Sequence, residues 1–517
     1  FRLPEMFLPV GSHDGGGGAG AAVELPAERG ELPLGSTGVL QDRLSALSDD
    51  ILLSILLRLP STAAAARTSV LSRRWRGLWS QLPEIRFPFP SDPAAVGPAL
   101  AASATGPALR LLHVACRDDA GAEAWLRTAA GRLGAGGELY FYNRTPGEER
   151  AHVGALSWQC HTFQLPCFET AGRVWLRLGF VDLNLPLTGV FERLTELRLE
   201  HVNLDCGSEL GDMVSSPRCP ALRELCISIA RGVDSLCIIS ETLERLELDM
   251  MNGLEDLTVN APMLRALNVH ACFTWRKPVA AIYASRLELL WWSDAFDPSF
   301  VVFSEMANLQ QLTTFNIPVY GRFDFALLQD SLMLLQHFPV VSQLDLKLNY
   351  ERDLSRYVYL MGTVTKLPNI KILSLWLHTK GHAIGASVFH LLSICPGVRK
   401  LKVTLRDNLK VDTPCTSVCA CQQENWNTSY TLDILEEVEI RNFRGSEHDF
   451  AFAEMLFSMS PAIKKMTITL HHLASPSELL LSLGNLGTCF EIKYDTSEVS
   501  YEPSFSLFPE TPDDHCT

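Results

Sequence analysis

The sequence lacks the features that mark membrane and secreted proteins. No run of about 18 apolar residues occurs that could span a bilayer, and the first residues lack the basic-then-apolar order of a signal peptide. The 14 cysteines form no dense framework of the kind that holds small secreted domains together. We therefore expect reduced thiols, no membrane partner and a cytoplasmic or nuclear location.

Basic charge is scarce. The chain has 44 Lys and Arg residues against 59 Asp and Glu residues, a net charge of −15. Sequence-independent phosphate binding needs a basic surface, so no nucleic-acid partner is expected. One short basic run departs from this balance, and it indicates either a solvated helix face or a surface that steers an acidic partner. Its members are Arg67, Arg73, Arg74 and Arg76.

Catalytic motifs are missing as well. The sequence contains no H-E-x-x-H, G-x-S-x-G or phosphate-loop motif. The glycine run at 15–18 is not followed by the Lys-Ser or Lys-Thr pair that a phosphate loop requires. We therefore expect a non-catalytic protein without a cofactor.

Cys415, Cys419 and Cys421 lie close together in a polar stretch and allow two interpretations. With a fourth ligand they could hold a structural zinc ion, and candidates for that ligand are Cys395, His378, His382 and His390. However, no paired C-x-x-C element occurs at a usual spacing. We therefore favour reduced loop thiols, and we predict no metal site.

The stretch after the glycine-rich N-terminus predicts three short helices. Apolar residues of the first helix recur at i, i+3, i+4 and i+7: Leu52, Ile55, Leu56 and Leu59. Pro60 ends this helix. Ser61 or Thr62 would cap a second helix over 63–70, and Ser72 would cap a third. Three helices of this size bury too little surface to fold alone, so part of their apolar surface should be an interface.

This stretch also carries an ordered motif. Its matching residues are Leu47, Asp49, Asp50, Ile55, Leu56, Leu59, Pro60, the run at 66–72, Arg73, Arg74, Trp75, Arg76, Leu78 and Trp79. Through these residues, the stretch 42–87 resembles the F-box of plant proteins. The alternative is a helical hairpin that packs only on the rest of its own chain. The family usually has proline where this chain has Ser48, but serine can cap the same helical turn.

The resemblance implies a partner. F-box domains bind the Skp-type adaptor of cullin-based ubiquitin ligases, and through it the cullin. The residues that would contact the adaptor are Leu47, Leu52, Ile55, Leu56, Leu59, Pro60, Val70, Leu71, Trp75, Leu78 and Trp79.

A repeat follows and determines the expected fold. The frame apolar-x-x-apolar-x-apolar occurs at 194–199, 222–227, 243–248, 264–269 and 287–292, with further copies halfway between at 233–238, 254–259 and 279–284. Later copies are more widely spaced, and several steps of 28 or 29 residues leave room for a helix in each turn, as at 325–338 and 386–394. A fixed period predicts a solenoid of short parallel strands. The pattern resembles leucine-rich repeats, and an ordinary α/β domain is the alternative.

Residues 435–475 predict strand, glycine turn, helix and strand. The segment resembles the FBD segment of plant F-box proteins on Phe443, Gly445, Phe452, Leu456, Pro461, Lys464, Lys465 and Met466. We expect it to cap the solenoid.

The predicted organisation is an α/β chain in which a three-helix F-box precedes a leucine-rich-repeat solenoid. Its parts are a disordered 1–41, the F-box at 42–87, a linker at 88–108, the solenoid at 109–434, the FBD cap at 435–475, and a C-terminal strand with a disordered tail at 476–517.

The expected function is recognition of substrates for a Skp-cullin-F-box (SCF) ubiquitin ligase, with a protein client on the solenoid. A leucine-rich-repeat scaffold whose F-box has drifted is the alternative. We expect the client to contact strand positions that point away from the core. The alternative is that these positions form a solvated face of the sheet that binds nothing. The selected positions are Arg198, Arg223, Arg245, Arg265 and Trp291.

Overall fold

The computed structural model describes residues 47–117, 121–143, 162–204, 207–273, 278–304, 306–321, 326–338, 341–406, 430–471 and 490–494, together with Cys415, Cys419 and Cys421. The chain divides into two units, Phe1–Ser48 and Asp49–Thr517. The second unit holds every element described below. The predictions of disorder at the two ends lie outside the described residues.

Three short helices open the second unit, as predicted: α1 Asp49–Leu56, α2 Thr62–Arg67 and α3 Trp75–Leu78. Ser61 caps α2, since its hydroxyl accepts a hydrogen bond from the Ala64 amide at 3.1 Å. The predicted cap of the third helix is wrong. A 3₁₀ turn and a further bend delay the start of α3, so Arg74 instead of Ser72 occupies the N-cap, without a side-chain hydrogen bond.

Residues 88–108 are part of the folded body, so the prediction of a linker there is wrong. Strand β1 Glu84–Ser91 crosses the expected boundary, and helix α4 Val96–Ala102 follows it. Val96 and Leu100 stand one helical turn apart and are fully buried. An Ala- and Pro-rich composition resembles a linker, yet two apolar residues on one face suffice to pack a short helix.

The main sheet has 17 strands in the described part of the chain. Its strands after β1 are β2 Leu109–Cys116, β3 Leu133–Asn143, β4 Thr162–Gln164, β5 Ala171–Asn184, β6 Glu196–Leu204, β7 Glu224–Arg231, β9 Arg245–Asp249, β11 Ala266–His270, β13 Leu289–Trp292, β15 Gln311–Pro318, β17 Gln343–Asn349, β19 Ile372–His378, β20 Lys400–Leu405, β21 Glu437–Phe443, β22 Lys465–Leu470 and β23 Phe490–Tyr494.

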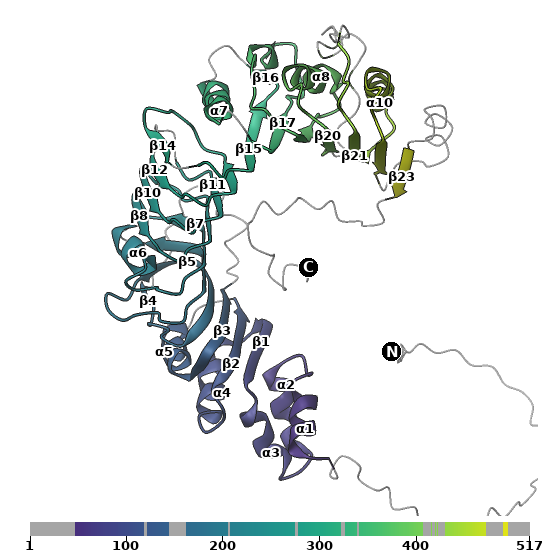
Figure 1. Ribbon diagram of the computed structural model, residues 1–517. Coiled ribbons are helices and arrows are strands. Elements are labelled where there is room, and N and C mark those ends of the chain that lie inside the picture. Colours follow the sequence, from purple (N-terminus) through teal and green to yellow (C-terminus); the bar gives the residue numbers. More distant parts are fainter. Residues whose placement is uncertain are drawn as a thin grey trace, which may run out of the picture. The chain divides into compact units, whose positions relative to one another are not determined.

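All neighbours in this sheet pair in parallel, and they follow the order of the chain, with β4 paired on one edge of β5 (Figure 1). The predicted solenoid of short parallel strands is confirmed. In a repeat protein each repeat contacts only the repeats before and after it, and the strand order of this sheet has that property.

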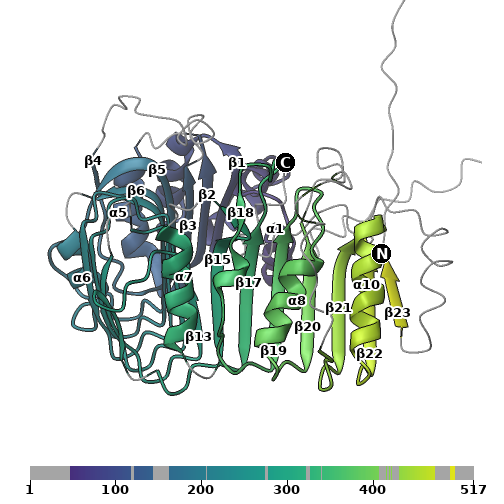
Figure 2. The same ribbon diagram turned by 90° about the horizontal axis from the view of Figure 1, so that it is seen from above.

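The halfway copies of the frame form a second parallel sheet, also as predicted. Its strands are β8 Ser235–Ile239, β10 Asp256–Asn260, β12 Val279–Tyr283 and β14 Val301–Ser304. From β15 onward helices take the place of this sheet and lie along the strands (Figure 2). These helices are α7 Ala326–His337, α8 Gly385–Ile394 and α10 Glu447–Met459. Two further helices, α5 Ala122–Arg132 and α6 Gly207–Val214, belong to earlier turns of the solenoid. None of the described helices is long and apolar enough to cross a membrane.

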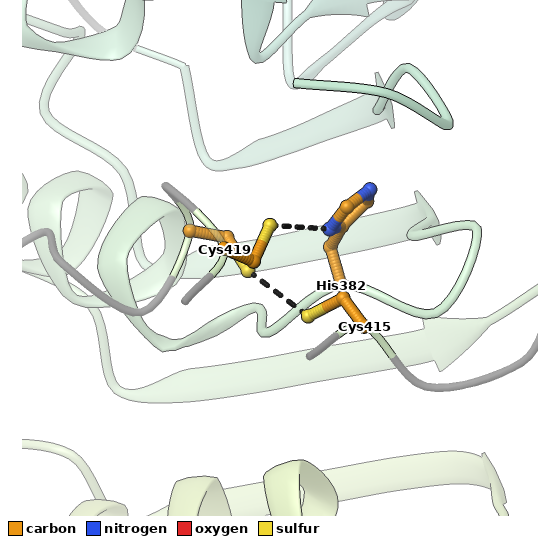
Figure 3. Close-up of side chains that lie close together, drawn as sticks. His382, Cys415 and Cys419 are labelled. Atoms are coloured by element: carbon orange, nitrogen blue, oxygen red, sulfur yellow. Dashed lines mark hydrogen bonds between the residues drawn. The ribbon is translucent and has the colours of Figure 1, made fainter. Parts of the chain in front are cut away.

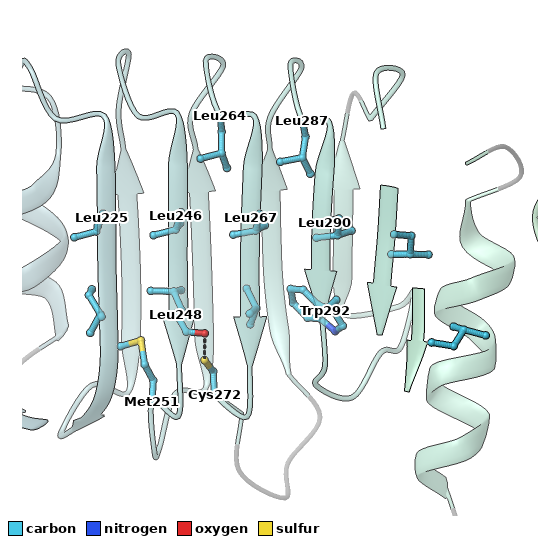
Figure 4. Packing of buried hydrophobic residues seen from close by; sticks show 14 of the residues in the cluster. Leu225, Leu246, Leu248, Met251, Leu264, Leu267, Cys272, Leu287, Leu290 and Trp292 are labelled. Atoms are coloured by element: carbon cyan, nitrogen blue, oxygen red, sulfur yellow. Dashed lines mark hydrogen bonds between the residues drawn. The ribbon is translucent and has the colours of Figure 1, made fainter. Parts of the chain in front are cut away.

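The apolar frame residues form the core between these layers. Leu225, Leu246, Leu267 and Leu290 stand in register on successive strands and are fully buried (Figure 4). Because strand side chains alternate between faces, the residue between two frame positions points to the other face of the sheet.

A left-handed residue ends the strand frame in several repeats. His201, Ile229, Met250, Ala271 and Asn442 have φ between 50° and 57°, and each stands two positions after the last apolar residue of its frame. Residues other than glycine rarely adopt this backbone conformation. Backbone hydrogen bonds between repeats hold the turn, as from the Met250 amide to the His270 carbonyl at 2.8 Å.

The segment at 435–475 forms the predicted strand, turn, helix and strand, as β21, α10 and β22. Gly445 has φ +79°, which favours glycine at this turn. Ser446 and Asp449 form a reciprocal capping box at the start of α10. The strand predicted beyond it is β23, which pairs with β22, so this segment is not the outermost layer of the described sheet.

Candidate protein-binding surfaces

Four of the residues predicted to contact the adaptor are buried inside the F-box. Leu52 and Leu56 are at most 2% exposed, and Trp75 and Leu78 are each 6% exposed. They hold the three short helices together. Substituting them would damage the fold of this region before it reported on any partner.

The other predicted residues leave an apolar surface open. Val70 is 87% exposed, Leu71 60% and Ile55 38%. Pro60 is exposed too, whereas Leu47, Leu59 and Trp79 are half-buried. Ile51 is 46% exposed and lies one turn before Ile55 on the same face of α1. The prediction left Ile51 out, although its position four residues before Ile55 was a signal for it.

The basic run around this surface is mostly solvated. Arg67, Arg73 and Arg76 are exposed. Arg74 pairs with Asp49 at 2.6 Å and so joins the start of α3 to the start of α1. The three exposed arginines leave positive charge beside the apolar residues, which suits an acidic partner.

The F-box runs directly into the sheet. The hydroxyl of the buried Thr62 accepts a hydrogen bond from the Arg86 amide at 2.8 Å. Leu82 and Ile85 are also buried where the chain enters β1. A buried hydrogen bond and apolar contacts thus tie α2 to the first strand of the solenoid.

Three of the arginines predicted to bind a client pair with glutamates of the next or preceding repeat. Guanidinium nitrogens of Arg223, Arg245 and Arg265 lie 3.0, 3.4 and 3.9 Å from carboxylate oxygens of Glu244, Glu224 and Glu288. All are partly exposed, and exposed ion pairs contribute little to stability. These side chains therefore stay accessible to a partner.

Arg198 differs from the other predicted arginines because it is only 4% exposed. Its guanidinium carbon lies 4.1 Å from the ring centroid of Trp175, in a cation–π contact, and its Nε lies 3.3 Å from the Glu196 carboxylate. Its position on the outward face was predicted, but its side chain is buried there against Trp175. A client would meet the neighbouring residues instead.

One register row crosses this face of the main sheet from β6 to β22. Its members are Arg198, Cys226, Glu247, Asn268, Trp291, Thr313, Asp345, Ser374, Lys402, Glu439 and Thr467. Except for Thr313, which stands between Leu312 and Thr314, all come from the position between the last two apolar residues of the frame. The same signal in the later repeats would have predicted Asp345 and Ser374 from the sequence.

A pocket of about 320 Å³ opens along this row and includes the predicted Trp291. Trp291 and Trp376 supply aromatic walls, while Lys402 and Arg441 bring positive charge. Tryptophan and arginine are the residues that most often anchor protein interfaces. The pocket therefore has the composition of a site for a polypeptide side chain or short segment.

Asp345 is one of the residues that line this pocket, and it is only 2% exposed. Gln311 and Gln343 donate side-chain hydrogen bonds to its carboxylate at 2.5 and 3.0 Å, and the Thr313 hydroxyl donates at 3.3 Å. Burial raises the pKa of Asp345, and these amides and Ser374 oppose that shift. A ligand cation that reached this carboxylate would favour its charged form.

A second pocket of about 400 Å³ lies where the F-box meets the first strands. Pro60, Arg86, His113 and Tyr140 are among its lining residues. Burial and the neighbouring Glu138 raise the pKa of Tyr140 to about 12, so its hydroxyl is a hydrogen-bond donor at neutral pH.

The imidazole of His270 makes the stability of the solenoid depend on pH. Its Nδ1 lies 2.6 Å from an Asp249 oxygen, and this hydrogen bond raises the pKa of His270, whereas burial and Lys347 lower it and Asp294 raises it. The stabilisation is therefore complete below the ordinary histidine pKa of about 6.5 and is lost as the pH rises through the raised pKa of the folded protein.

We expect the difference in Tm between the intact chain and His270→Gln to shrink from about pH 5.5 to about pH 8.5. Its largest value should correspond to about 1 kcal/mol or less, the scale of a partly exposed pair. Thermal melts of both proteins across this range check the prediction, and a difference independent of pH would contradict it.

The structure separates the residues considered as zinc ligands into two groups. Cys395 is buried at the end of α8, where burial raises its pKa to about 12. His390 Nε2 lies 2.9 Å from the Val364 carbonyl. His378 ends β19 and is not in the group. His382, by contrast, meets Cys415, Cys419 and Cys421, with all four ligand atoms within 4.8 Å of one another.

Comparison with known proteins agrees with this architecture. A model of the F-box domain matches residues 44–87. A model described as the leucine-rich repeats of FBD-associated F-box protein At5g56370 matches residues 122–311. The chain therefore carries an F-box followed by leucine-rich repeats, so the predicted resemblance and fold class are confirmed.

The names of curated relatives from Arabidopsis thaliana also combine an F-box with leucine-rich repeats. F-box/FBD/LRR-repeat protein At2g04230 is 25% identical over 44% of this chain and 53% of its own length. F-box/LRR-repeat protein At3g26922 is 29% identical over 45% of this chain and 76% of its own length. F-box/LRR-repeat protein 25 is 44% identical over 13% of this chain and 25% of its own length.

The match spans 53% of the length of F-box/FBD/LRR-repeat protein At2g04230 and 53% of the length of the Arabidopsis putative F-box/FBD/LRR-repeat protein At3g49030, which is about half of each. Proteins of this class are generally non-catalytic adaptors. The assignment of 435–475 to an FBD segment lies outside both matched ranges and stays a prediction.

Proposed function

We propose that this chain is a substrate-recognition subunit of an SCF-type ubiquitin ligase. The observation that carries the proposal is the exposed apolar surface of the F-box, led by Val70 at 87% and Leu71 at 60% exposure. Exposed apolar residues gathered in a small helical domain are typical of a protein interface. The partner proposed for this surface is a Skp-type adaptor, and through it a cullin.

In this function the chain contributes proximity instead of chemistry. The F-box binds the adaptor, and the solenoid holds a protein client beside the ubiquitin-carrying enzyme that the cullin recruits. Holding two reactants together raises the rate at which client lysines react. The exposed Arg67, Arg73 and Arg76 would speed the encounter with an acidic adaptor more than they would tighten the complex. For this role we expect the protein in the cytoplasm or the nucleus.

The pocket around Asp345 is the proposed place for the client. Two tryptophans and a buried carboxylate give it both an aromatic anchor and a defined hydrogen-bonding centre. The carboxylate favours a client group that donates hydrogen bonds, such as a lysine or arginine side chain. Arg223, Arg245 and Arg265 extend this surface along earlier repeats.

A second function follows from one departure in the motif. Ser48 stands where the family usually has proline, so the F-box could have drifted while the repeats kept a partner. The chain would then be a leucine-rich-repeat scaffold, and no ubiquitin would be transferred.

Binding to the adaptor separates the two proposals. The full chain and a purified plant Skp-type adaptor should form a complex of submicromolar Kd in a titration by calorimetry, on the scale of specific complexes of standard size. Thermal melts of the chain alone serve as the control for folding. A folded chain that binds no adaptor in a panel of isoforms would support the scaffold and overturn the ligase proposal.

A further inference from the structure

A group of three thiols and one imidazole lies outside the surfaces proposed for adaptor and client. Cys415 Sγ lies 3.4 Å from Cys421 Sγ, and Cys419 Sγ lies 3.3 Å from His382 Nδ1. In Figure 3 the Cys419 sulfur is directed at the ring of His382, with Cys415 at its side. His382 and Cys421 are buried, whereas Cys415 and Cys419 are half-buried.

These distances match a single tetrahedral ion. With zinc–sulfur bonds of about 2.3 Å, two sulfurs of a tetrahedral site lie about 3.8 Å apart. The four ligand atoms here all lie within 4.8 Å of one another. We propose that His382, Cys415, Cys419 and Cys421 bind one structural Zn²⁺ ion. Three sulfurs and one nitrogen are a closed zinc set, since no ligand position remains for water or a substrate.

The surroundings of His382 orient it for this role. Its Nε2 lies 3.1 Å from the Arg352 carbonyl. A carbonyl only accepts hydrogen bonds, so Nε2 carries the proton and the lone pair of Nδ1 faces the three cysteines. Metal-binding histidines are usually held in this way by their second nitrogen. The ring also lies parallel to that of Tyr350, at 6.3 Å between centroids.

The backbone brings the cysteines to the same place. The Cys415 amide donates a hydrogen bond to the Gly381 carbonyl at 3.0 Å, so Cys415 lies beside the turn that carries His382. His448 Nε2 lies 3.6 Å from the Cys415 sulfur, and a nitrogen there can donate a hydrogen bond to a thiolate. The ion would thus join the turn after β19 to the long connection between β20 and β21.

This site explains an insertion in the solenoid. The frames that begin at residues 398 and 435 stand 37 residues apart, whereas the neighbouring steps, from 370 to 398 and from 435 to 463, are 28 residues each. Closing a long loop costs entropy that a metal clip offsets. Binding deprotonates three thiols and releases the protons to solvent, so zinc affinity should fall at low pH.

The test is the zinc content of the full chain, purified under reducing conditions without chelator. We expect about one Zn²⁺ per chain by plasma mass spectrometry, and intense visible bands of tetrahedral thiolate-bound Co²⁺ after exchange. A chelator should lower the Tm of the intact chain. A folded chain without zinc and without cobalt bands would overturn the proposal.

Variants separate a built site from general thiol binding. Cys419→Ser, Cys421→Ser and His382→Ala should each lose most of the zinc, whereas His382→Cys should keep it, because four thiolates also bind zinc. Cys237→Ser is the matched control, since Cys237 is an exposed free cysteine on β8. Equal zinc in Cys419→Ser and the intact chain, or a Cys415–Cys421 disulfide in non-reducing mass spectrometry, would contradict the site.

Discussion

Replacing Val70 and Leu71 together by aspartate should weaken adaptor binding by about 30-fold or more, which corresponds to about 2 kcal/mol, the loss of one interface hot spot. Both side chains are largely exposed and so contribute little to the fold. In the complex the two carboxylates would lose their hydration against an apolar partner surface, which costs free energy. In the free chain they stay hydrated, so this cost falls on binding alone. Calorimetric titration of the double variant with the adaptor measures the loss.

The control for this variant is Ile239→Asp. Ile239 is 51% exposed on β8, in the solenoid, and should keep the affinity of the intact chain. Leu56→Ala and Trp75→Ala are poor probes because both side chains are buried and their removal would destabilise the F-box. Unchanged affinity in a folded Val70→Asp, Leu71→Asp chain would show that this surface is not the adaptor interface.

Asp449→Ala should destabilise the C-terminal end of the solenoid by about 3 kcal/mol or more, the cost of breaking a buried ion pair. Asp449 is 2% exposed, and its carboxylate lies 3.1 Å from the guanidinium of Arg444. It also accepts hydrogen bonds from the amides of Arg444 and Ser446 at 3.2 Å. Alanine would leave the arginine charge buried and remove the capping box of α10.

Hydrogen exchange is the suitable measurement, because a repeat protein can open at one end without unfolding as a whole. Amides of α10 and β22 should exchange about 100-fold faster in Asp449→Ala, since each 1.4 kcal/mol changes an equilibrium constant tenfold. Glu447→Ala is the matched control, because Glu447 is an exposed acidic residue in the same helical turn. Exchange within threefold of the intact chain would mean that the pair contributes little to this end.

The sequence by itself determined the order of the elements. Leu225, Leu246 and Leu267 repeat at 21 residues, and this period alone predicts stacked strands because each strand must bury one apolar face on its neighbours. The halfway frames predicted the second sheet for the same reason. Proline at position 60 and glycine at position 445 marked a helix end and a turn, since both act through the local backbone.

Only the tertiary structure decided which side chains are accessible. Arg198 and Arg223 occupy outward positions in the frame, yet Arg198 is buried against Trp175 and Arg223 stays solvated. Likewise Leu56 and Val70 are both apolar residues of the F-box, but one is core and the other is surface. Burial depends on neighbours from other segments, which a local pattern does not contain.

The tertiary structure also decided which of several candidate ligands meet. Cys395 and His390 are close to the cysteine triplet in sequence, but His382 is the residue brought to it. The left-handed turns at Ile229 and Ala271 have the same origin, because hydrogen bonds between repeats hold a conformation that neither residue favours alone. Period and composition fix a repeating backbone, whereas sites arise where distant segments come together, and that contact is a property of the folded chain.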